Sequence, residues 1–115
     1  MSSAAAYVVP VALLGASNLF MTLAWYGHLK FKAAPLALVI MVSWGIAFIE
    51  YCLAVPANRL GHGVYTAAQL KTIQEVVTLV VFCGFSVVYL KEAISLTTAA
   101  GFALIALGAM LVFRG

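Results

Sequence analysis

Residues 35–55 read PLALVIMVSWGIAFIEYCLAV, and this stretch decides the class of fold. Its one charged residue is Glu50. The hydrocarbon core of a bilayer requires about 20 predominantly apolar residues per helix, so a run of this length is typical of a transmembrane helix. A strand is excluded because an open sheet edge in lipid would leave backbone groups without hydrogen bonds.

Similar apolar runs fill the rest of the chain. We expect helices at about 4–29, 35–55, 66–90 and 95–113. Lys30 and Lys32 close the first run, residues 56–63 supply a Pro, an Asn and two Gly for a turn, and residues 91–92 form a short corner. Ser95 or Thr97 can cap the last helix. Such short turns force successive helices to cross the membrane in opposite directions.

The composition agrees with a protein built almost wholly of spans. Of its residues, 66% are apolar and 8% are charged, whereas soluble domains are about half apolar and a quarter charged. We therefore predict an all-α integral membrane protein whose single domain, residues 1–115, is an up-down-up-down bundle of four helices. No space is left for a soluble catalytic domain, and no nucleophile elbow or Gly-rich phosphate loop is present, so we expect no enzyme.

The charged residues and cysteines exclude several partner classes. The net charge is +3, but the six Lys and Arg are scattered and form no basic stripe for nucleic acid. Cys52 and Cys83 lie in apolar runs without a His or second Cys at ligand spacing, so we expect no metal and no cofactor. The expected surroundings are a lipid bilayer, in the cell inner (plasma) membrane.

Two acids lie inside predicted spans, Glu50 and Glu75. An acid near the bilayer centre costs on the order of 3 kcal/mol on the insertion scale, so each is a candidate functional residue. Both lie within a few turns of the loop at residues 56–63. We expect them to share a depth, and one cavity could be lined by both.

The neighbours of the two acids differ. Glu75 follows Lys71 by one helical turn, so it is either a substrate- or proton-binding group or half of a structural ion pair. Lys71 itself can extend toward the membrane surface. Glu50 has no basic residue one turn away on its own helix. It must find a partner on another helix, carry a proton, or make a helix-packing hydrogen bond as the neutral acid.

Three uncharged residues complete the candidate site. Asn18 is in mid-span, where an amide either hydrogen-bonds a neighbouring helix or lines a pore. Trp25 shares its helix face, and Trp44 lies deeper than an interfacial aromatic residue should. Trp44 therefore either lines an aromatic cavity or packs against a helix. In the first case Trp25 and Trp44 would offer ring faces to a substrate cation.

The basic residues give no preferred orientation. One side of the membrane would carry Lys30, Lys32 and Lys91, and the other Arg59, Lys71 and Arg114. Because Lys and Arg bias sets orientation, an even count is expected if the chain inserts both ways and pairs antiparallel. A single orientation set by a partner would leave the same sequence.

The last predicted helix contains Gly101-Phe-Ala-Leu-Ile-Ala-Leu-Gly108, with small residues on one face that allow close helix approach. Together with the preceding YLKEAIS (residues 89–95), it resembles the small multidrug resistance proteins and the wider drug/metabolite transporter superfamily. Lys91 stands where that pattern has a Gly. The resemblance implies four helices and a homodimer, which we expect to form through Gly101 and Gly108.

Longer segments resemble a branch of that superfamily whose function is unknown. They are NLFMTLAWYGHLKFK (18–32), EYCLAVPANRLG (50–61) and QLKTIQEVVTLVVF (69–82). The multidrug branch couples transport to protons through a glutamate in its first helix, but the first helix here contains no acid. If the chemistry is retained, Glu50 or Glu75 must perform it.

The sequence thus predicts a small secondary transporter for a small metabolite or organic cation. The main alternative is a non-transporting accessory or assembly subunit whose acids only hold helices together. An ion channel is less favoured because no filter-like loop is visible.

Overall fold

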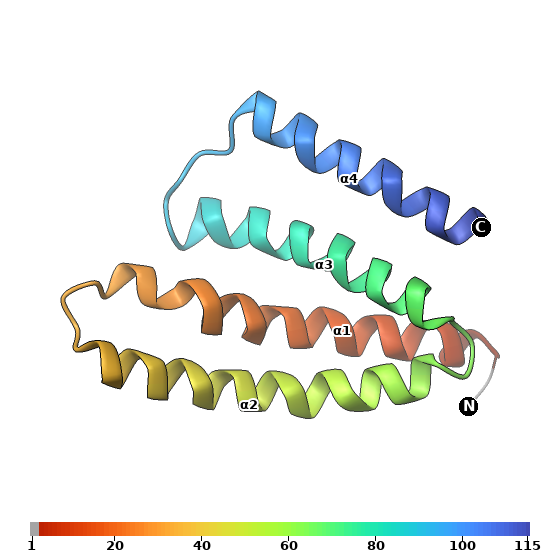
Figure 1. Ribbon diagram of the computed structural model, residues 1–115, viewed down its shortest axis with the longest axis horizontal. Coiled ribbons are helices and arrows are strands. Elements are labelled where there is room, and N and C mark those ends of the chain that lie inside the picture. The colour runs from red at the N-terminus through yellow and green to blue at the C-terminus, as the bar shows by residue number, and fades with distance from the viewer. Residues whose placement is uncertain (1–2) are drawn as a thin grey trace.

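The computed structural model describes residues 3–115, and within them the chain forms four long helices joined by short turns (Figure 1). They are α1 (Ser3–Tyr26), α2 (Leu36–Gly61), α3 (Ala67–Val88) and α4 (Leu96–Arg114), and a 3-10 turn, η1 (Gly27–Lys30), follows α1. The predicted all-helical architecture is confirmed. Each span is long and apolar enough to cross a membrane, which indicates a multi-pass membrane protein.

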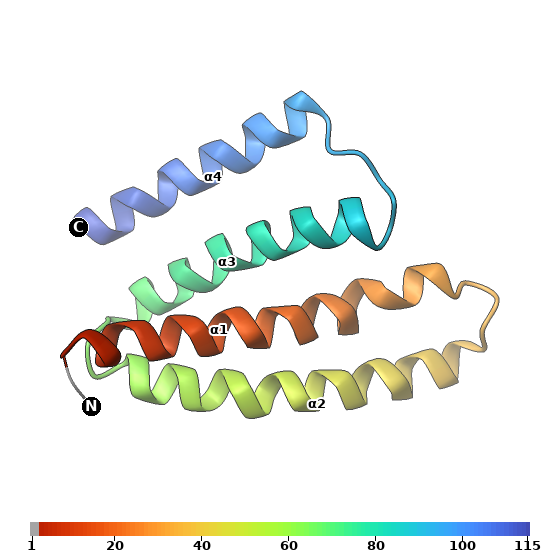
Figure 2. The same cartoon turned by 180° about the vertical axis from the view of Figure 1, so that it is seen from behind.

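Successive helices run in opposite directions and lie side by side in the order α2, α1, α3, α4 (Figures 1 and 2). α1 packs on α2 along one side and on α3 along the other, whereas α4 packs mainly on α3. The molecule measures 48 × 34 × 19 Å, so the helices form a layer instead of closing into a ring. The start of α1 and the end of α4 lie at the same end of this layer (Figure 1).

The end of α2 corrects the sequence-based prediction. The second helix was expected to stop near residue 55, but α2 continues through Pro56 to Gly61. Pro56 cannot donate a hydrogen bond to the carbonyl of Cys52. Ala57 and Gly61 beyond it are buried, however, and their packing outweighs the lost bond. The turn predicted for residues 56–63 is therefore confined to residues 62–66.

Side-chain caps begin α3 and α4. The Thr66 hydroxyl accepts from the Gln69 N–H at 3.1 Å, and the Gln69 side chain accepts from the Thr66 N–H at 3.0 Å. Of the two residues expected to cap the last helix, Ser95 is the one that does, accepting from the Thr98 N–H at 3.1 Å. These caps satisfy N–H groups that have no partner within their helices.

The buried core lies toward the α2–α3 turn. Leu14, Ala57 and Leu70 form its cluster, one residue from each of α1, α2 and α3. Gly61 lies beside them, because a Cβ at this position would be 3.2 Å from the Cβ of Pro10 and 2.6 Å from a methyl of Leu70. The three helices approach closely here because Gly61 has no side chain.

Candidate functional site

Glu50 lies on the face of α2 that packs against α1. The partly or fully covered residues on this face recur every three or four positions: Ser43, Ile46, Ala47, Glu50, Leu53, Ala54 and Ala57. The Glu50 side chain is half-buried, and residues 3–115 supply it with no hydrogen bond or ion pair. It is therefore an acid held between two helices without a polar partner from the described chain.

Two contacts fix how α1 and α2 line up along their length. Gly61 lies against Pro10 at one end, and Ser43 lines a cavity together with His28 toward the other. Counting equal steps inward from both contacts places Glu50 level with Met21, near the middle of the packed length. Glu50 therefore lies near the middle of a helix that is long and apolar enough to cross a membrane. A carboxylate is most costly near the centre of a bilayer.

Asn18 is a buried link between α1 and α3. Its amide nitrogen donates to the carbonyl of Leu14 at 2.8 Å, and its amide oxygen accepts from the Thr78 hydroxyl. Asn18 thus makes a hydrogen bond with a neighbouring helix, and its role in lining a pore stays a prediction. Thr78 as the partner could not be identified beforehand, because 60 residues separate the two positions.

Glu75 and Lys71 form the ion pair that their spacing allows. The Lys71 Nζ lies 2.8 Å from a Glu75 carboxylate oxygen, and the two side chains are 72% and 55% exposed. Glu75 therefore has a partner on its own helix, whereas Glu50 has none within residues 3–115.

The chain does not bring the two acids together as we expected. Helix α1 lies between most of α2 and α3 (Figure 1). Glu50 and Glu75 line none of five cavities formed by the described residues.

Trp25 and Trp44 do lie together. Both line a groove of about 340 Å³ between α1 and α2, and their exposed fractions are 67% and 72%. Ala47 also lines this groove, and Glu50 follows it by one helical turn on the same face of α2. The two indoles therefore border the α1–α2 contact that contains Glu50.

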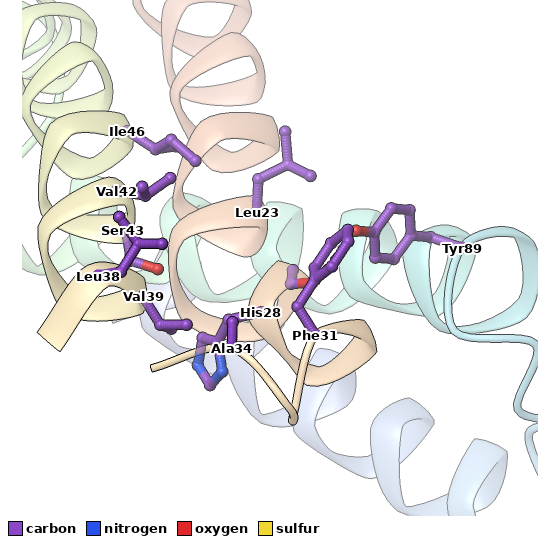
Figure 3. A pocket seen from close by; sticks show the side chains of 11 residues that line it. Leu23, His28, Phe31, Ala34, Leu38, Val39, Val42, Ser43, Ile46 and Tyr89 are labelled. Carbon is purple, nitrogen blue, oxygen red and sulfur yellow. The ribbon is translucent and has the colours of Figure 1, made fainter. Parts of the chain in front are cut away.

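A second cavity, of about 300 Å³, opens beside the same contact. Figure 3 shows Leu23, Phe31 and Tyr89 along one of its walls and residues of α2 along the other. His28 and Ser43 line both this cavity and the tryptophan groove. Val39 lines both as well, so the two hollows adjoin along a wall formed by these three residues.

Tyr89 holds the end of α3 against η1. Its hydroxyl donates to the carbonyl of Gly27 at 3.1 Å, and the Lys30 Nζ lies 4.2 Å from the centre of its ring. The ring also stacks on Phe85. Sequence reasoning missed this cluster because it joins residues far apart in the chain, although an aromatic ring near a basic residue at a membrane surface is a recognisable anchor pattern.

The expected dimerisation residues lie on an uncovered face of α4. A Cβ placed at Gly101 or Gly108 would meet no heavy atom of the described chain within 4 Å. No residue of α4 is buried by residues 3–115. This small-residue face is therefore open to lipid or to another protein.

The described residues contain no metal site. No group of three or more His, Cys, Asp or Glu side chains in residues 3–115 is placed to hold a metal ion, and Cys52 and Cys83 are free thiols.

A family model described as "Putative member of DMT superfamily (DUF486)" matches residues 10–113. The match runs from the first turns of α1 to the last turn of α4. No curated protein and no solved structure matches the chain.

Proposed function

Because the chain belongs to the DUF486 family, we propose that it is a small secondary transporter of the drug/metabolite transporter (DMT) type, in the plasma membrane. Its substrate is a small metabolite or an organic cation. Two copies in opposite orientations form the transporting unit, and the Glu50 carboxylate binds either the substrate or a proton.

The observation that carries the proposal is the isolation of Glu50. We assign Glu50 to mid-membrane depth because it lies near the middle of the packed length of α1 and α2, and it has no polar partner within residues 3–115. An unpaired carboxylate at this depth costs on the order of 3 kcal/mol, so a proton or a cation must neutralise it. Competition between these two ligands for one carboxylate couples the export of one to the import of the other. Glu75 is the weaker candidate because Lys71 already neutralises it.

A cation approaching Glu50 would meet the tryptophan groove first. Trp25 and Trp44 line this groove, and its lining residue Ala47 lies one helical turn from Glu50. The faces of indole rings attract cations by about 0.5–2 kcal/mol. The arrangement therefore suits an organic cation better than an anion.

The layered shape supports a dimer. A flat layer of four helices cannot surround a substrate at the level of Glu50. Transporters with inverted repeats build their central site from two halves of opposite orientation. The open face of α4 at Gly101 and Gly108 offers a surface for the second copy.

Matched substitutions of the two acids test the proposal. In proteoliposomes with an outward or inward proton gradient, we expect Glu50→Gln to reduce uptake of the probe cation phenethylammonium by about tenfold to a hundredfold, because its N–H groups lose a hydrogen bond to a charged carboxylate. Glu75→Gln should keep most of the uptake. Gel filtration in detergent checks that both variants remain folded.

Two outcomes would contradict this assignment. Unchanged uptake in Glu50→Gln would remove the carboxylate from the mechanism. Absence of uptake by the unaltered protein, with instability in both variants, would favour the accessory-subunit alternative.

The dimer model has its own test, in which reporters active only inside or only outside the cytoplasm are fused to the C-terminus. Signal from both is expected, and signal from one alone rules out the antiparallel pair.

A further inference from the structure

A cluster of basic and amide side chains lies where the end of α2 meets the start of α3. It lines two adjoining cavities, of about 340 and 520 Å³. The polar residues of this cluster are Asn58, Arg59, His62, Lys71 and Gln74. None of them belongs to the site around Glu50.

The two cavities share a wall. Asn58 and His62 line both, Lys71 lines the first, and Arg59 lines the second. Gln74 donates to the side-chain oxygen of Asn58 at 2.9 Å, which fixes the shared wall across the two helices. This bond uses the oxygen of Asn58 and leaves its NH₂ group available as a donor. The charged lining residues are cationic, and Glu75 offsets Lys71 from the next turn of α3.

The continuation of α2 past Pro56 sets the depth of this cluster. With 26 residues, α2 is about 39 Å long at 1.5 Å per residue, whereas the hydrocarbon core is about 30 Å thick. The last turns of α2, which include Arg59, and the residue that follows the helix, His62, therefore reach the level of lipid headgroups. Tyr51 and Val55 line the same cavity one to two turns deeper, at the level of acyl chains.

We propose that this cluster binds the phosphate group of an anionic phospholipid. Arg59, His62 and Lys71 hold the phosphate, and the acyl chain follows the wall formed by Tyr51 and Val55. Basic pockets between transmembrane helices suit anionic headgroups, since each Lys or Arg near the surface contributes about 1 kcal/mol. Inorganic phosphate would meet the same cations but would gain nothing from the apolar wall.

The test measures lipid binding to the purified full chain in a neutral detergent. Native mass spectrometry counts bound dioleoyl phosphatidylglycerol, with dioleoyl phosphatidylcholine as the neutral comparison. We expect phosphatidylglycerol to bind preferentially, and Arg59→Gln to weaken its binding about fivefold, the equivalent of one cation–headgroup interaction. The matched control is Arg114→Gln, because Arg114 lies at the same end of the molecule but lines the cavity between α3 and α4.

A second variant is expected to strengthen lipid binding, and a gain in binding cannot be explained by a loss of folding. Glu75→Gln releases Lys71 from its ion pair, so we expect phosphatidylglycerol to bind a few times more tightly. Equal losses in Arg59→Gln and Arg114→Gln would overturn the proposal in favour of diffuse surface charge. Displacement of the lipid by millimolar inorganic phosphate would overturn it in favour of a free-anion site. Equal binding of the two lipids would overturn it outright.

Discussion

Helices α1 and α4 are both apolar spans, yet they occupy opposite kinds of position. The buried residues of α1 are Pro10, Leu14, Ser17, Asn18, Thr22 and Ala24, whereas the described chain buries no residue of α4. The difference is not one of hydrophobicity, because α4 is the more apolar of the two. Apolar composition puts a helix in the membrane, and a different property decides which helix lies inside the protein.

That property is the packing face. The packed face of α1 combines small and polar residues, and Asn18 bonds α3 through Thr78. Lipid chains are as apolar as leucine, so close contact and hydrogen bonds between helices replace the hydrophobic effect as the cause of association. α4 also has small residues at Gly101 and Gly108, but they meet no atom of the described chain. α4 therefore has a small-residue face suited to helix packing, but no helix of the described chain packs against it.

The largest expected effect on stability comes from shortening a buried core side chain of α1. Leu14→Ala should lower the free energy of unfolding by about 2 kcal/mol, the lower end for a buried leucine, because lipid offers no hydrophobic gain on folding. Leu14 is 1% exposed and Leu104 on α4 is 68% exposed. Leu104→Ala should therefore change stability by less than about 0.5 kcal/mol. Titration with sodium dodecyl sulfate, followed by circular dichroism in dilute micelles, measures both. Equal losses would show that α4 is packed as tightly as α1.

Replacing a glycine by alanine should change the free energy of unfolding in opposite directions in the two regions. At Gly61 an added Cβ would press on Pro10 and Leu70, so Gly61→Ala should destabilise the fold by about 1–1.5 kcal/mol, the lower part of the range for overpacking, because the closest atom belongs to the flexible Leu70 side chain. At Gly108 the space is open, and Gly108→Ala should stabilise α4 by up to about 1 kcal/mol through helix propensity. The same titration with sodium dodecyl sulfate measures the stability of both variants. A destabilising Gly108→Ala in dilute micelles would mean that its face is already covered.

The spans and local contacts of this chain follow from its sequence, whereas the order of the helices does not. The Lys71–Glu75 pair and the Ser95 cap were predictable because each joins residues within one turn. The central place of α1 was not, since four helices that are apolar all round give no unique pairing. The Asn18–Thr78 bond depends on that pairing and was equally hidden.

The prediction that α2 ends near residue 55 failed for a related reason. Pro56 and the glycines after it are a strong local turn signal. The buried contacts of Ala57 and Gly61 are tertiary, and they decide the outcome. The isolation of Glu50 could be expected from its own helix, which has no basic neighbour one turn away. Its separation from Glu75 could not, because it depends on α1 lying between α2 and α3.

The smallest expected effect lies at the corner that joins the packed helices to α4. Lys91 has a φ of 61°, in the left-handed region that a residue with a side chain adopts at a cost. Gly adopts this conformation without a steric cost. Lys91→Gly should therefore raise the free energy of unfolding by about 0.5–1 kcal/mol, once the extra freedom of Gly in the unfolded chain is subtracted.

Lys91→Ala separates the backbone from the charge in this test. It removes the same ammonium group but keeps a Cβ, so it should give no stabilisation. If both variants were stabilised equally, repulsion involving the Lys91 charge would be the cause. If only Lys91→Gly is stabilised, the corner is a strained link. Two features then weaken the attachment of α4 to the other helices. The described chain buries no residue of α4, and the corner that joins α4 to α3 contains an unfavourable backbone conformation at Lys91.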